Sequence, residues 1–314
     1  MHHPFYRLRG EASQAMILPL LPGGDGNRVQ GQPHLFRKVF TMSKVMLFAS
    51  GKGGVGKSTI TANLAVHLAR LGRSVVLVDA DIGLRSLDLF LGLENRVVYD
   101  LLDAAHGRCM LSQALLSSDD LPSLRLLPAA QFARCKELDP RKLRKILARL
   151  KKENDFILID CPAGMERGLR NVLNAGADET VLIVTPDDLC IRGAERVAAL
   201  LEEKELPRPG IIVNRLDNDL IFAKEMVAAR VVSDLLDRPL LGEIPEDPAV
   251  YMAQLRRRLV LDYACEAREA LIRIARRLDG ETVSLPEYGK KRRSFFRRHF
   301  PSPLKEVESD GQNR

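Results

Sequence analysis

The hydrophobic positions between residues 43 and 280 alternate between short apolar runs and longer helix-like segments. Several short runs are β-branched and apolar at successive positions, as strands are when a parallel sheet is covered on both faces. This alternation predicts an α/β fold, namely a doubly wound, mostly parallel sheet flanked by helices. The predicted strands are Lys44–Ala49, Ser74–Asp79, Leu124–Leu127, Phe156–Asp160, Glu179–Thr185, Gly210–Asn214 and Leu240–Ile244. The predicted helices are Ser58–Leu71, Pro140–Glu153, Met165–Asn174, Cys190–Lys204, Ala223–Leu236 and Tyr263–Leu278.

The two ends of the chain lack this alternation. Residues 1–41 are rich in Gly, Pro, Gln and Arg and show no sustained period, so we predict a disordered leader. Because Met42 stands just before the first predicted strand, we favour a mis-assigned start codon over a regulatory arm. We expect a folded domain over residues 42–280, a linker over 281–288, a helix over 289–300 and a disordered polar tail over 301–314.

Composition argues against several classes of protein. A chain with 46% hydrophobic and 28% charged residues is ordinary for a globular domain. No run approaches the roughly 18 uncharged apolar residues of a membrane-spanning helix, and no secretion signal is apparent. The five cysteines form no C-x-x-C pair and the six histidines show no ligand spacing. We therefore expect a cytoplasmic protein with reduced thiols and no zinc or iron–sulfur centre.

The net charge of +7 is unevenly distributed. Residues 289–300 contribute +6, residues 301–314 contribute −1 and residues 1–41 contribute +3, which leaves −1 for residues 42–288. A nearly neutral domain with a basic tail argues against a surface built for nucleic acid. The positive charge is instead concentrated in the tail, residues 289–300.

A glycine-rich stretch carries the strongest chemical signal. Residues Gly51 to Ser58 fit the phosphate-binding pattern G-x-x-x-x-G-K-[ST], with a predicted strand before it and a predicted helix after it. Its backbone N–H groups can surround a polyphosphate at the helix N-terminus. Lys57 would reach the β- and γ-phosphates, and the Ser58 hydroxyl would bind Mg²⁺ supplied with the nucleotide. The predicted binding loop comprises Gly51, Lys52, Gly53, Gly54, Val55, Gly56, Lys57, Ser58 and Thr59.

Aspartates follow two of the predicted strands, at the edge of the sheet where ligands bind in such folds. Asp160 stands where a P-loop protein places a carboxylate associated with Mg²⁺, and Asp81 could both orient the attacking water and contact the metal. Asp79 could hold the loop or belong to the metal shell. One such aspartate alone would more often be a helix cap or a turn former, but two beside one phosphate loop favour function.

Lys52 lies early in the loop, where an ordinary P-loop needs no second cation. It could be a solvated surface charge. It could also reach the phosphates bound by a neighbouring subunit, as an arginine finger does in trans. The sequence alone does not distinguish between these two roles of Lys52.

These motifs together resemble the MinD/ParA family of ATPases, whose phosphate loop is a deviant Walker A motif. The stretch from Lys52 to Lys57 carries that motif, and the likeness covers about residues 44–300. Three further stretches resemble the MinD branch in particular: Asp79-Ala80-Asp81-Ile82-Gly83-Leu84-Arg85-Ser86-Leu87-Asp88, Gly92-Leu93-Glu94-Asn95-Arg96-Val97-Val98-Tyr99-Asp100 and Asp160-Cys161-Pro162-Ala163-Gly164-Met165-Glu166.

The resemblance assigns roles to several positions. It implies that Lys52 contacts the partner's nucleotide in an ATP-bound homodimer, and that Asp81 and Asp160 are the aspartates of the two switch segments. Lys57, Ser58 and Thr59 match the family's phosphate and Mg²⁺ contacts. Asn214 matches the asparagine that contacts adenine, and Pro245 and Asp247 lie in a loop resembling the one that closes over the base. Ser58 and Ser86 stand where Thr and Asn are common in the family, and neither departure removes a required functional group.

The basic tail has an aromatic face. On a helical wheel, the three phenylalanines of residues 289–300 share an arc of about 140°, although one arginine falls inside it. A basic helix of this kind suits the plane of an anionic membrane, although a solvated tail and a nucleic-acid patch are the ordinary alternatives. The resemblance favours the membrane, because the family ends in such a helix. The predicted membrane residues are Arg292, Arg293, Phe295, Phe296, Arg297, Arg298 and Phe300.

The resemblance implies a Mg²⁺-dependent ATPase that dimerises with ATP, binds the cytoplasmic face of the cell membrane and positions the division septum. Its implied partners are a MinC-type division inhibitor, a MinE-type or other topological regulator and anionic lipids, with no nucleic acid. The alternatives are a flagellar-number MinD-like ATPase, a ParA-type DNA-partitioning ATPase, an iron–sulfur carrier of the Mrp type and a non-enzymatic nucleotide-gated adaptor. The iron–sulfur reading lacks its C-x-x-C pair, and the neutral domain argues against DNA partitioning.

Overall fold

The structure, a computed structural model, describes residues 42–134, 137–164 and 167–286. The predicted leader and the predicted tail helix, with all its membrane residues, lie outside the described residues.

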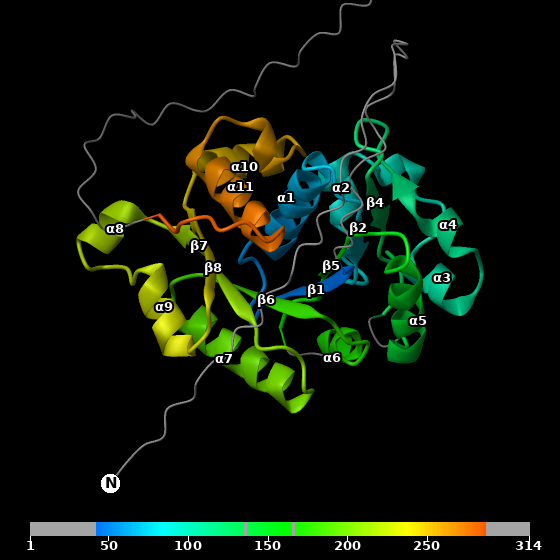
Figure 1. Cartoon of the computed structure of the whole chain (residues 1–314), viewed down its shortest axis with the longest axis horizontal. Helices are drawn as coiled ribbons and strands as arrows, with labels where there is room; N and C mark the ends of the chain where they lie inside the picture. The colour runs from blue at the N-terminus through cyan, green and yellow to red at the C-terminus, as the bar shows by residue number, and fades with distance from the viewer. Residues whose placement is uncertain (1–41, 135–136, 165–166, 287–314) are drawn as a thin grey trace, which may run out of the picture. The chain divides into compact units, whose positions relative to one another are not determined.

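An eight-stranded sheet confirms the predicted architecture (Figure 1). Its spatial order is β3-β4-β2-β5-β1-β6-β7-β8, and every neighbouring pair is parallel except β3 with β4. Each strand predicted from the sequence is present, and β3 is an additional short edge strand. The strands are β1 (Lys44–Ala49), β2 (Val75–Asp79), β3 (Leu116–Ser117), β4 (Leu124–Leu127), β5 (Phe156–Asp160), β6 (Glu179–Val184), β7 (Gly210–Leu216) and β8 (Leu240–Pro245).

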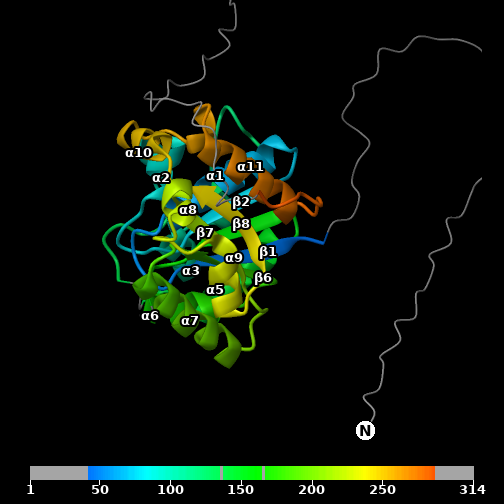
Figure 2. The same ribbon diagram turned by 90° about the vertical axis from the view of Figure 1, so that its left-hand side faces the viewer.

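Helices cover both faces of this sheet (Figures 1 and 2). Helices α1 and α11 pack together over one face, while α7 and α9 pack over the other. Both layers exclude water from the central strands, so every residue of β2 and β5 is buried. The helices are α1 (Lys57–Arg70), α2 (Leu87–Leu91), α3 (Leu101–His106), α4 (Leu111–Ala114), α5 (Pro140–Leu150), α6 (Arg167–Leu173), α7 (Asp188–Glu203), α8 (Asn218–Phe222), α9 (Ala229–Leu236), α10 (Pro248–Leu255) and α11 (Glu266–Leu278).

One predicted helix is wrong in its first half. The sequence predicted a helix over Ala223–Leu236, but α8 ends before Ala223 and α9 begins only at Ala229. Between them the backbone of Lys224 adopts a φ of 63°, a left-handed conformation that cannot continue a right-handed helix. The chain therefore forms two short helices with a turn between them.

The direction of the strands determines where the site lies. Because β1, β2, β5, β6, β7 and β8 run parallel, their carboxyl ends meet at one edge of the sheet. The segments after β1, β2 and β5 carry the glycine-rich loop and the predicted aspartates. Among the helices that the structure describes, none is long and apolar enough to cross a membrane.

Candidate functional site

The glycine-rich loop joins β1 to α1, and close packing requires glycine at two of its positions. Gly56 precedes α1 with a φ of 94°, and a Cβ there would lie 2.6 Å from Nδ2 of Asn214. A Cβ on Gly51 would lie 2.1 Å from the carbonyl carbon of Gly193 in α7. The loop is thus confined between β7 and α7, with its N–H groups available at the start of α1.

A buried ion pair lies at the centre of the site. The Lys57 Nζ lies 2.5 Å from Oδ1 of Asp160, and both side chains are almost completely buried. Burial alone would lower the pKa of Lys57, but the Asp160 carboxylate outweighs it, and the pKa is raised overall. Lys57 is therefore a fixed positive charge, held by the strand-end aspartate.

The carboxylates around this pair fit a magnesium ion carried by a nucleotide. Asp160 Oδ2 is buried and has no hydrogen-bond partner among the described residues. Asp81 is partly buried nearby, and burial raises the pKa of its carboxyl despite the opposing charge of Lys57. The described residues contain no protein-only cluster of metal ligands. Asp160, Asp81 and the Ser58 hydroxyl could therefore complete a Mg²⁺ shell whose other ligands are phosphates and waters.

Asp79 holds the loop after β2, which is one of the two roles that the sequence left open. Its Oδ1 accepts from the N–H of Asp81 at 3.0 Å, and its Oδ2 accepts from the N–H groups of Ser86 and Leu87 at 3.2 and 3.3 Å. Burial, together with the charge of Asp160, raises the pKa of Asp79 to about 7. Asp79 thereby fixes the backbone that presents Asp81.

Lys52 lies at the surface of the loop with its ammonium 3.7 Å from Oδ1 of Asp187, which precedes α7. Both side chains are about half exposed. Such a pair contributes only about 0–1 kcal/mol, so Lys52 can leave it readily. The position is compatible with both roles that the sequence left open for Lys52.

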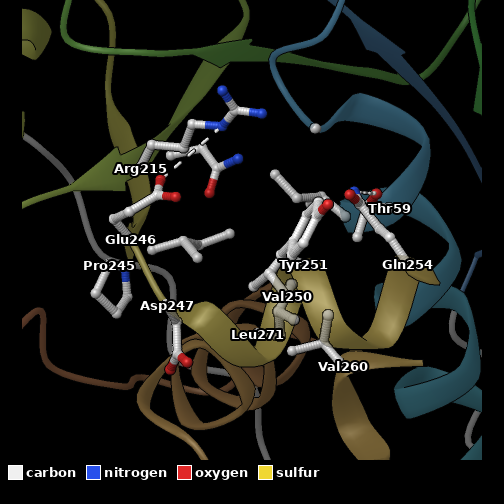
Figure 3. A pocket seen from close by; sticks show the side chains of 14 residues that line it. Thr59, Arg215, Pro245, Glu246, Asp247, Val250, Tyr251, Gln254, Val260 and Leu271 are labelled. Carbon is white, nitrogen blue, oxygen red and sulfur yellow. Dashed lines mark hydrogen bonds and ion pairs between the residues drawn. The ribbon is translucent and has the colours of Figure 1, made fainter. Parts of the chain in front are cut away.

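A pocket of about 160 Å³ opens beside the phosphate loop, between α1, β7 and α10 (Figure 3). Asn214, which lines the pocket, is nearly buried, and its Nδ2 donates to the carbonyl of Val55 at 2.8 Å. This bond engages one of the two amide N–H groups, which leaves the amide oxygen and the second N–H for a ligand. The lining residues are Gly56, Thr59, Ile60, Asn214, Arg215, Ile244, Pro245, Glu246, Asp247, Val250, Tyr251, Gln254, Val260 and Leu271.

Asp247 has a structural function in this pocket. Its Oδ1 accepts from the N–H of Ala249 and caps α10, while its Oδ2 accepts from the N–H of Ala267 in α11. Both oxygens are thus engaged by the backbone, whereas Pro245 is one of the residues that line the pocket (Figure 3). Asp247 fixes the loop that borders the pocket.

The structure thus gathers the predicted loop, Asp81, Asp160, Asn214 and Pro245 at one edge of the sheet. Sequence reasoning missed four residues around it: Asp187, Arg215, Tyr251 and Gln254. Arg215 donates to the carbonyl of Gly54 at 3.0 Å, and Gln254 donates to the Thr59 hydroxyl at 3.1 Å. Only Arg215 carried a sequence signal, because it follows Asn214 directly.

Comparisons with known proteins agree with this geometry. Residues 46–260 match the family described as the CobQ/CobB/MinD/ParA nucleotide-binding domain. The chain is 40% identical over 249 residues to the septum site-determining protein MinD of Synechocystis, spanning 79% of this chain and 93% of that protein. It is 41% identical to the MinD of Bacillus subtilis, spanning 78% of this chain and 92% of that protein.

Solved structures give the same result. A MinC:MinD cell division complex of Aquifex aeolicus has a chain with 38% identity and a TM-score of 0.71, covering 79% of this chain and 100% of that chain. A MinD of Pyrococcus horikoshii complexed with Mg-ADP has 32% identity and a TM-score of 0.68, covering 76% of this chain and 97% of that chain.

Proposed function

The chain belongs to the CobQ/CobB/MinD/ParA nucleotide-binding family and, within it, to the MinD septum site-determining proteins, and on that premise we propose that it is a Mg²⁺-dependent ATPase that helps place the division septum. The observation that carries the proposal is the buried pair of Lys57 and Asp160 beside Asp81, at the end of a glycine-rich loop. The Mg-ADP bound to the MinD of Pyrococcus horikoshii supports this choice of ligand.

Each residue has a defined part in the proposed reaction. The loop N–H groups and Lys57 bind the phosphates and neutralise charge on the transferred phosphoryl group. Mg²⁺, held by Ser58 with Asp160 and Asp81 close by, would supply further positive charge at the β- and γ-phosphates. Asp81, presented by the loop that Asp79 fixes, orients the attacking water. Asn214 offers its amide oxygen as an acceptor for the amino group of adenine.

Dimerisation would complete the site. Lys52 is held only by a half-exposed ion pair, so it is free to contact the phosphates bound by a second copy of the chain. The ATP-bound homodimer would then carry two copies of the basic aromatic tail, residues 289–300. Two weak anchors on one particle bind a surface far more strongly than one. Nucleotide binding thus controls attachment to the cytoplasmic face of the membrane.

The partners follow from the family. The Aquifex aeolicus MinC:MinD complex supports a MinC-type division inhibitor as the protein recruited by the ATP-bound form. A MinE-type or other topological regulator would stimulate hydrolysis and release the protein from anionic lipids. The nearly neutral charge of residues 42–288 supports a membrane partner over DNA.

The variant Asp81→Ala tests the hydrolytic role. If Asp81 orients the water, this variant should bind ATP and dimerise, while phosphate release falls by about 100-fold or more, the magnitude associated with loss of one catalytic group. Asp120→Ala, which removes an exposed aspartate remote from the loop, is the matched control. Phosphate release at the wild-type rate in Asp81→Ala would exclude this role.

A further inference from the structure

Tyr251 is a large aromatic side chain that the proposed reaction leaves unused. It lies on α10 at the mouth of the pocket beside the phosphate loop, and 63% of its surface is exposed. Leu255, one helical turn later, is 61% exposed but does not line the pocket. Tyr251 therefore differs from an ordinary exposed apolar residue in facing a binding cavity.

The helix that carries Tyr251 is anchored at both ends. At its start, Asp247 caps α10 and also binds the backbone of α11. At its end, the Gln254 amide donates to the Thr59 hydroxyl in the first turn of α1, at 3.1 Å. The helix backbone that carries the ring is thus held at a fixed place relative to the phosphate loop.

The pocket around the ring suits a flat heterocycle. Figure 3 shows the Tyr251 ring rising from α10 beside Thr59 and Gln254, across the pocket from Arg215 and Glu246. The apolar side chains of Ile244, Pro245 and Val250 line the space beside it, and the Asn214 amide lies at the base. An aromatic face beside apolar walls, with one fixed amide, matches a base better than a sugar or a peptide.

We propose that Tyr251 is a specificity-determining residue whose ring stacks on the purine base of the bound nucleotide. The inference rests on the proposed nucleotide-binding function and adds to it the outer wall of the base site. A purine offers a larger stacking surface than a pyrimidine, so Tyr251 favours purine over pyrimidine nucleotides. Gln254 is a positioning residue that holds α10 against Thr59.

Binding measurements with three ligands test this role. We would titrate Mg²⁺-ATP, Mg²⁺-CTP and Mg²⁺-tripolyphosphate into the full chain by calorimetry, in wild type, Tyr251→Ala, Tyr251→Phe and Leu255→Ala. Stacking of a base on an aromatic ring typically strengthens binding by about 5- to 150-fold. Tyr251→Ala should therefore weaken ATP within that range, weaken CTP less and leave tripolyphosphate unchanged. Tyr251→Phe, which keeps the ring, and Leu255→Ala should both bind ATP within about twofold of wild type.

Three results separate the possible failures. If Tyr251→Ala binds both ATP and tripolyphosphate as wild type does, the stacking role is wrong while phosphate binding stands. If tripolyphosphate weakens as much as ATP, the substitution has disturbed the phosphate loop, and the stacking role is again wrong. If wild type binds neither ligand, the proposed nucleotide-binding function fails, and this inference fails with it.

Discussion

Removing either partner of the Lys57–Asp160 pair should destabilise the protein even without nucleotide. Besides its proposed role in binding phosphates, the Lys57 ammonium is half of a buried ion pair with a separation of 2.5 Å. Lys57 is 6% exposed and Asp160 is fully buried. Lys57→Met would therefore leave the carboxylate of Asp160 without a partner in a medium that solvates it poorly, beside Asp79 in the neighbouring strand.

The magnitude follows from the burial of both groups. Breaking a buried pair from one side typically costs about 3–5 kcal/mol, whereas replacing both partners with neutral groups of similar volume is often close to neutral. We therefore expect Lys57→Met to lose about 3–5 kcal/mol of unfolding free energy at pH 7.5. The double variant Lys57→Met/Asp160→Asn should recover most of that loss.

Urea unfolding of the nucleotide-free protein, followed by circular dichroism, measures these differences. Lys44→Met, which breaks the half-exposed surface pair of Lys44 with Glu179, is the matched control and should cost less than about 1 kcal/mol. If Lys57→Met costs no more than this control, the buried pair does not stabilise the fold. If the double variant loses the sum of the two single losses, Lys57 and Asp160 do not act as a pair.

Three further predictions address the loop, a buried carboxyl and the dimer. Gly56→Ala should abolish nucleotide binding measured by calorimetry, because its Cβ would strike the Asn214 amide at 2.6 Å and its φ of 94° disfavours a side chain. Burial raises the pKa of Glu243 from 4.5 to about 7, so its folded carboxyl keeps a proton that the unfolded chain loses at lower pH. Ionisation of Glu243 should therefore cost the folded protein up to about 3 kcal/mol as pH rises from about 4.5 to 7, and urea unfolding at pH 5 and pH 8 should show wild type losing more stability than Glu243→Gln. Lys52→Ala should bind ATP as a monomer in analytical ultracentrifugation, and ATP-dependent dimers of normal stability would exclude its role in trans.

The strands of the core could be predicted because their buried apolar residues are consecutive in the sequence. Phe156–Asp160 is apolar at four successive positions, and only a strand covered on both faces needs this pattern. The phosphate loop was equally clear, since its glycines and Lys57 are contiguous in the sequence. In contrast, α8 and α10 are too short for a helical period to emerge, so their positions became apparent only from the folded chain.

The rest of the site depends on contacts between distant parts of the chain. Tyr251 looks like any surface residue until the folded chain places α10 beside Thr59, nearly two hundred positions earlier in the sequence. The sequence gives no sign that Asp187 pairs with Lys52, or that the carboxylate of Asp247, assigned to the base site, accepts hydrogen bonds from the N–H groups of Ala249 and Ala267. Such contacts leave no local pattern in the sequence, because tertiary packing brings the two residues together and their spacing along the chain does not reveal it.

Control of membrane attachment by the nucleotide state can be measured by sedimentation with vesicles of anionic lipids. With Mg²⁺-ATP the full chain should pellet with the vesicles, and with Mg²⁺-ADP it should remain in the supernatant. The variant with Phe295, Phe296 and Phe300 replaced by Ser should bind ATP normally and stay in the supernatant with either nucleotide. Equal sedimentation in ATP and ADP, or undiminished sedimentation of the triple variant, would contradict the account.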